Sequence, residues 1–217
     1  MGKKRLHNIV RISVACFCLA VLFTALVKPV EAKTFNKAAA KKKVSVTCCR
    51  LNEGILVICK NKNKTNLKIT MNMKFLDGDG QVISREEQTN LCLTAKSTAT
   101  FYFVGPRNEY GNIIDYTSYK QSFSINKSGK TSRVKSISVS SKLDNIEGKF
   151  VGVNSGSKKL TNIHATMVFY SSDGTPWFCN TKSLNCFKPN DIDQFSIFYA
   201  DRSGCPSKVK VYVDWAY

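Results

Sequence analysis

Two short stretches decide the fold: residues 73–80 read MKFLDGDG, and residues 167–174 read MVFYSSDG. In the run that leads into the first stretch, apolar residues alternate with polar ones, at Ile69, Met71, Met73 and Phe75. The run before the second stretch repeats this pattern, at Ile163, Ala165, Met167 and Phe169. Period-two alternation puts the apolar side chains on one strand face and the intervening residues on the face toward water. Each stretch therefore predicts a strand that ends in a tight turn.

The two stretches are related by a shift of 94 residues, from Met73 to Met167. The same shift, with no gap, also matches Gly54 with Gly148, Val57 with Val151, Gly80 with Gly174, Cys92 with Cys186 and Phe101 with Phe195. Because apolar matches share a strand face and glycine matches fall on turns, we interpret the chain as one fold unit present twice. Short β-branched and aromatic runs without a helical period predict an all-β chain of two antiparallel β-sandwiches, at residues 44–127 and 133–217.

The N-terminal residues have the three parts of a secretory signal peptide. A basic head, Lys3-Lys4-Arg5, precedes an uncharged run over residues 12–27, and small residues flank a cut after Ala32. The run is shorter than the roughly 20 residues that cross a membrane, although an uncleaved anchor stays open as an alternative. We therefore expect residues 1–32 to be a cleaved signal and the mature chain to be secreted or held in the cell envelope. Residues 33–43, KTFNKAAAKKK, are predicted to be a mobile basic linker.

Several short motifs resemble the FxLYD family, whose members are small immunoglobulin-like sandwiches of secreted and envelope proteins of Gram-positive bacteria. The name-giving strand and turn are similar to Phe75-Leu76-Asp77 followed by Gly80, and to Phe169-Tyr170 followed by Asp173-Gly174. An earlier family strand looks like residues 148–154, GKFVGVN, and a later one like the segment from Phe187 to Phe195. The resemblance implies two tandem immunoglobulin-like domains that bind a partner or act as spacers, and it brings no catalytic residues.

The chain is strongly basic, with a formal net charge of +18. Removing the +4 of residues 1–32 leaves +14 on the mature chain. Such a charge favours contact with anionic cell-wall polymers or lipid head groups, although a solvated basic surface is the plainer reading. We expect contact through lysines of the linker and of two matching loops, namely Lys41, Lys42, Lys43, Lys60, Lys62, Lys64, Lys158 and Lys159. Nucleic acid is not an expected partner, because no recognition helix or RNA-binding aromatic motif accompanies the charge.

Residues suited to catalysis are scarce. His164 is the one histidine of the predicted mature chain. Because it lies on the polar side of a predicted strand, we expect it to be an inert surface residue. No pair of carboxylates is predicted to converge in a cleft. The two aspartates of residues 77–80 fall short of the six to eight oxygen ligands that calcium takes. We therefore predict neither an enzyme nor a cofactor, and no metal site.

Seven cysteines remain after the predicted cut, an odd number for an exported chain. Cys179 and Cys186 bracket a predicted hairpin and are candidates for a disulfide, and Cys59 lies one strand away from Cys48 and Cys49. Fully reduced, buried cysteines are the alternative. Zinc is a weaker reading, because the usual spacing of paired cysteines is missing.

Together these observations predict a non-catalytic, exported binding or spacer protein that contacts anionic surfaces. The alternatives are an exported protein that works through thiol and disulfide chemistry, and a module that mates with another exported protein. Trp177, just after the second turn, is a candidate contact residue if it proves exposed.

Overall fold

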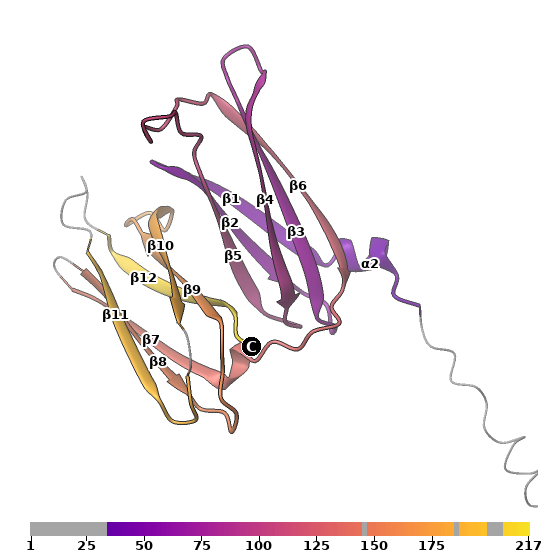
Figure 1. The fold of residues 1–217 in the computed structure, drawn as a ribbon, viewed down its shortest axis with the longest axis vertical. Helices are drawn as coiled ribbons and strands as arrows, with labels where there is room; N and C mark the ends of the chain where they lie inside the picture. The colour runs from indigo at the N-terminus through magenta and orange to yellow at the C-terminus, as the bar shows by residue number, and fades with distance from the viewer. Residues whose placement is uncertain (1–33, 145–146, 185–186, 199–205) are drawn as a thin grey trace, which may run out of the picture. The chain divides into compact units, whose positions relative to one another are not determined.

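The computed structural model describes residues 34–144, 147–184, 187–198 and 206–217, which leaves the predicted signal peptide outside the described residues. Residues 36–217 form one compact unit. In this unit a short helix, α2 (Lys37–Lys41), and one 3-10 turn, η1 (Val134–Ser136), accompany twelve strands (Figure 1). The strands are β1 (Val44–Leu51), β2 (Gly54–Asn61), β3 (Leu67–Leu76), β4 (Val82–Leu93), β5 (Thr98–Val104), β6 (Ser118–Lys127), β7 (Ile137–Leu143), β8 (Glu147–Asn154), β9 (Ile163–Tyr170), β10 (Pro176–Leu184), β11 (Ile192–Phe198) and β12 (Lys208–Trp215). No helix in these ranges is both long and apolar enough to span a membrane.

The strands pair in four three-stranded antiparallel sheets, which confirms the predicted all-β class. Two sheets lie in residues 44–127, the first half, with strand orders β1-β2-β5 and β4-β3-β6. Two lie in residues 133–217, the second half, with orders β7-β8-β11 and β10-β9-β12. Each strand of the first half therefore has a counterpart six positions later in the second half. The same connectivity occurs twice along the chain.

The strand that carries MKFLDGDG has the predicted alternation. Ile69, Met71, Met73 and Phe75 are fully buried on the inner face of β3. Their counterparts in β9, from Ile163 to Phe169, are also buried, but so are Thr166 and Val168 on the other face of that strand. The expectation that this second face meets water was wrong. A period of two identifies one buried face and carries no information about what covers the opposite one.

The turns after β3 and β9 match in backbone geometry. Gly80 and Gly174 have positive φ angles of 78° and 82°, a region that favours glycine. The aspartate whose carboxylate stabilises the turn occupies a different position in each of the two turns. Asp77 Oδ1 accepts the N–H groups of Asp79 and Gln81, at 3.1 and 2.8 Å. In the second turn Asp173 accepts from the Ser171 hydroxyl, at 2.6 Å, and from Thr175, and these bonds lower the pKa of Asp173 to about 2.

The shift of 94 residues does not hold along the whole repeat. The buried side chain of Asn61, at the end of β2, donates to the Thr65 and Leu93 carbonyls, and its oxygen accepts the Asn63 N–H. Asn154 makes the same kind of bonds at the end of β8, to the Lys158 and Phe187 carbonyls and from the Gly156 N–H. The two asparagines are 93 residues apart, so the predicted gapless match of β2 with β8 was wrong by one residue. From Asn154 to Ile163 the chain is therefore one residue longer than from Asn61 to Ile69.

The basic linker is partly folded. Residues 37–41 form α2, whose first turn is capped by the Asn36 side chain, and Ala40 is buried. The Asn63 side chain donates to the Ala40 carbonyl at 3.1 Å, and the Lys41 ammonium lies 4.7 Å from the centre of the Phe123 ring. The prediction of a mobile linker was therefore wrong for residues 36–43. Three consecutive alanines favour helix, and a nearby strand end supplies the partner that the sequence pattern did not reveal.

The two halves contact each other through one sheet face of each half. These two faces are apolar at the contact, whereas the equivalent faces of the other sheets are not. Leu51 and Leu56 of the first half form a buried cluster with Val168, Cys179 and Tyr212 of the second. The strand registers give the counterparts of three of these residues in the other half: Lys149 for Leu56, Lys74 for Val168 and Arg85 for Cys179. All three counterparts are exposed. The contact is thus a specific feature of one face in each half, and the equivalent faces carry charge.

Candidate functional site

Seven exposed lysines gather at the end of the first half from which α2 leads into β1. Backbone and side-chain bonds hold this end together. The Lys62 N–H donates to the Lys43 carbonyl at 2.8 Å, and the Lys96 ammonium donates to the Lys62 carbonyl at 2.6 Å. Ser45 pairs with Lys60 across β1 and β2. We call this surface the basic end; it consists of Lys41, Lys42, Lys43, Lys60, Lys62, Lys64 and Lys96.

The acidic residues of the first half lie elsewhere. Between residues 44 and 127 they occur only in the β1–β2 turn, in the β3–β4 turn with the adjoining part of β4, and in the β5–β6 connection, at Glu53, Asp77, Asp79, Glu86, Glu87, Glu109 and Asp115. None of the salt bridges found among the described residues involves a lysine of the basic end. These ammonium groups are therefore left to attract anions from solution.

Two of the predicted contact lysines lie apart from this cluster in the fold. Lys158 and Lys159 are exposed in the connection between β8 and β9, which is the counterpart of the loop that holds Lys62 and Lys64. An acidic segment adjoins this loop, because the Asn154 N–H at its start donates to the Asp191 carbonyl. The surroundings of the second loop are thus of mixed charge, whereas the basic end contains no acid.

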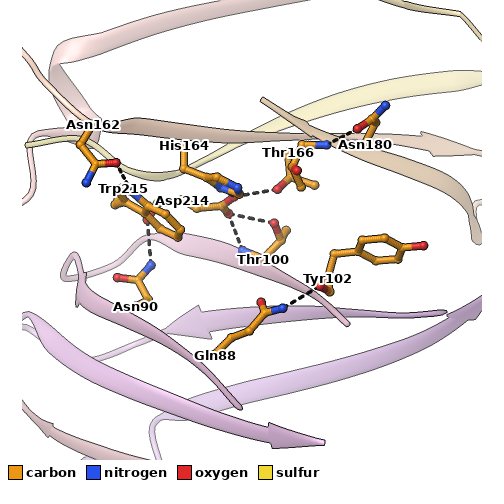
Figure 2. Close-up of polar contacts among 11 residues, drawn as sticks. Gln88, Asn90, Thr100, Tyr102, Asn162, His164, Thr166, Asn180, Asp214 and Trp215 are labelled. Atoms are coloured by element: carbon orange, nitrogen blue, oxygen red, sulfur yellow. Dashed lines mark hydrogen bonds and ion pairs between the residues drawn. The ribbon is translucent and has the colours of Figure 1, made fainter. Parts of the chain in front are cut away.

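A second cluster lies where the halves meet, around the fully buried carboxylate of Asp214 (Figure 2). Its Oδ1 accepts the Thr100 N–H and hydroxyl, at 2.5 and 2.9 Å. Its Oδ2 accepts the Thr166 hydroxyl at 2.7 Å and lies 2.9 Å from His164 Nδ1. The Asn90 side chain donates to the Asp214 carbonyl at 2.8 Å. A buried carboxylate is stable only when donors surround it, and here both halves supply them.

His164 is part of this cluster, so its prediction as an inert surface residue was wrong. Its side chain is 20% exposed, and its ring stacks on Trp215 with the centres 4.3 Å apart. Because a carboxylate accepts and does not donate, the contact with Asp214 places the proton on Nδ1. Trp177, the other aromatic residue singled out from the sequence, is partly buried against the core of the second half and is not an exposed contact residue.

The cysteines of the first half have the properties of structural thiols. Burial raises the pKa of Cys48 to about 11 and that of Cys59 to about 12, and it also raises the pKa of Cys49. Cys48, Cys49 and Cys59 are free thiols. Cys179 is buried in the contact between the halves, and Cys186, its predicted disulfide partner, lies outside the described residues. Raised pKa values suppress the thiolate that redox exchange requires.

We expect Cys48 and Cys59 to resist alkylation while the chain is folded. With a pKa of about 11, only about one thiol in a thousand is a thiolate at pH 8. Treatment with iodoacetamide at pH 8, followed by peptide mass spectrometry, is expected to leave both residues largely unmodified, whereas the same treatment in urea modifies them fully. Rapid modification of either residue without urea would instead support thiol chemistry.

Asp214 and Thr100 were not identified from the sequence. They lie 114 residues apart and come together only because the halves pack against each other. The asparagines at the ends of β2 and β8 were also missed, although the sequence contains a pattern that marks them. Asn61-Lys62-Asn63 and Asn154-Ser155-Gly156 each end an apolar strand. Within the described ranges, no three His, Cys, Asp or Glu side chains are grouped as a metal site would need.

Comparison with known proteins identifies no family. No family model matches the chain, and no curated protein matches it. Among solved structures, a transglutaminase from red sea bream aligns with 86% of this chain at 10% sequence identity and a TM-score of 0.26. The chain spans about a third of that protein's length, 34%. A likeness of this degree carries no argument about fold or activity.

Proposed function

We propose that this chain is an exported, non-catalytic binding protein that attaches to anionic surfaces of the cell envelope through its basic end. In this proposal residues 1–32 are a cleaved signal peptide, and the two halves are tandem immunoglobulin-like sandwiches of the FxLYD type. The strand order β1-β2-β5 with β4-β3-β6, and its repetition in the second half, supports that assignment.

The observation that carries the proposal is the separation of charge within the first half. Seven exposed lysines share one end, and every acid of that half lies in other segments. Lysine ammonium groups are mobile point charges that suit repeated phosphate or carboxylate groups better than one shaped ligand. Each lysine held against an anionic surface contributes about 1 kcal/mol, so the group can bind without any fitted pocket.

The folded state of residues 36–43 also supports the proposal. If these residues were an unattached linker, their lysines would lose conformational entropy on binding. The Asn36 cap and the contact of Ala40 with Asn63 instead hold the backbone beside the β2–β3 loop. Lys41, Lys42 and Lys43 therefore add to the field of Lys62 and Lys64 before any ligand arrives.

The test compares two charge reversals that change the net charge equally. Lys62→Glu with Lys64→Glu alters the basic end, and Lys158→Glu with Lys159→Glu alters the counterpart loop of the second half. At low salt we expect the first pair to weaken binding to inorganic polyphosphate and to phosphatidylglycerol vesicles about ten-fold or more, and the second pair to weaken it less than about two-fold. Isothermal titration and vesicle sedimentation provide the affinities.

Salt dependence completes this test. Binding by the basic end is expected to weaken steeply between about 50 and 200 mM salt, because bound anions release their counterions. All four substituted lysines are exposed, so circular dichroism should show unchanged folding. Equal losses for the two pairs would mean that net charge alone drives binding, and an absence of binding at low salt would reject the proposal.

A further inference from the structure

A pocket of about 430 Å³ opens beside the Asp214 cluster, between β4 and β5 of the first half and β9, β10 and β12 of the second. Its volume falls in the range of about 300–1,000 Å³ that is usual for small-molecule sites, which favour the junctions between domains. Four lining residues that matter for recognition are labelled in Figure 2, namely Gln88, Tyr102, His164 and Trp215, and Thr181 is the fifth.

Several polar groups of this lining are in part unused. The Gln88 side-chain N–H donates to the Tyr102 carbonyl at 2.7 Å, which leaves its own oxygen as an acceptor. The Thr181 hydroxyl has no protein partner within the described ranges. Because His164 Nδ1 is taken up by Asp214, Nε2 is left as the ring nitrogen that can bond to a ligand. The pocket therefore offers an amide oxygen, an imidazole nitrogen and a hydroxyl within one lining.

The lining contains no lysine, arginine, aspartate or glutamate, although the chain has a net charge of +18. A pocket for phosphate or carboxylate would be expected to use some of the abundant lysines. Trp215 instead supplies a broad apolar ring. Stacking on His164 and a 3.4 Å hydrogen bond from the indole N–H to the Asn162 side chain hold this ring in place. Polar acceptors beside an aromatic ring suit a ligand with hydroxyl donors on its edge and C–H groups on its face.

We propose that this pocket binds a neutral saccharide. A sugar hydroxyl donates to Gln88 Oε1, other hydroxyls pair with His164 Nε2 and with the Thr181 hydroxyl, and a face of the sugar ring packs against the aromatic side chains. Asp214 acts as a positioning residue, since it fixes the proton of His164 without reaching the pocket. This site is independent of the basic end, because no lysine of the basic end lines it.

The test is a titration of residues 33–217, which include the whole compact unit, with two neutral probes: the tetramer of N-acetylglucosamine and the tetramer of glucose. Nuclear magnetic resonance should show saturable shifts of the Trp215 indole and Thr181 amide signals with at least one tetramer. Thr181→Val removes one hydroxyl from an exposed position and is expected to weaken binding about three- to ten-fold.

Two controls keep this result specific. Thr117→Val makes the same chemical change at an exposed position outside the pocket and should leave the affinity unchanged. The Lys62→Glu, Lys64→Glu variant should bind the saccharide normally, which separates this proposal from the anionic one. The proposal is overturned if neither tetramer shifts these signals at about 10 mM, which is roughly the weakest affinity a specific site would show, or if inorganic phosphate shifts them instead.

Discussion

Replacing Asp214 with asparagine is expected to lower the free energy of unfolding of residues 33–217 by about 3–5 kcal/mol. The asparagine side chain has nearly the same shape, but its NH₂ group turns one acceptor into a donor. Thr100, Thr166 and His164 all point donors at the carboxylate, so at least one buried donor loses its partner. The effect is large because Asp214 is fully buried and is shared by both halves.

Urea denaturation followed by tryptophan fluorescence measures this loss. Asp79→Asn is the matched control, since it removes one carboxylate charge from an exposed turn and should change the free energy of unfolding by less than about 0.5 kcal/mol. If Asp214→Asn were as mild as this control, the bonds to Asp214 would contribute little to the contact between the halves.

The second large effect is expected from Leu56→Lys, which installs the residue that occupies the corresponding position of the second half. Leu56 is fully buried among side chains from both halves, whereas its counterpart Lys149 is exposed. The change removes apolar burial and places an ammonium group in an apolar contact, at a combined cost of about 3 kcal/mol or more. We expect the two halves to unfold independently of each other, so that calorimetry shows two unfolding transitions where the parent chain shows one.

The reverse exchange, Lys149→Leu, is the control for this experiment. Lys149 forms surface ion pairs with Asp144 and Glu147, at 3.1 and 2.9 Å, and solvent screens such exposed pairs so that their loss has little effect on stability. It should therefore leave a single transition in place. A single, unshifted transition in Leu56→Lys would contradict the view that the apolar cluster couples the halves.

The sequence predicted the elements that depend on local pattern. The alternation over residues 69–75 predicted the inner face of β3, and Gly80 and Gly174 predicted the two turns, where the structure gives both glycines positive φ angles. Both features arise within a few residues of chain, from side-chain spacing and from the conformational range of glycine. The all-β class follows from many such local patterns.

The features that were missed depend on contacts between distant segments. Residues 164, 166 and 168 were predicted to face water because they alternate with the apolar face of β9, yet the first half covers them. Likewise, the sequence predicted the lysines at residues 41–43, Lys62, Lys64, Lys158 and Lys159 as contact residues of one kind. The fold shows that the first two groups adjoin, whereas Lys158 and Lys159 lie in a separate loop. Such proximity has no periodicity that a single sequence can show.

The central claim, that the basic end is the anion-binding surface, is tested most directly by mapping amide signals of residues 33–217 during titration with inorganic polyphosphate at low salt. We predict that the largest shifts occur at residues 41–43, 60–64 and 96, and that they disappear as salt is added. Shifts centred on Lys158 and Lys159, on the pocket beside His164, or spread evenly over the surface would contradict the claim.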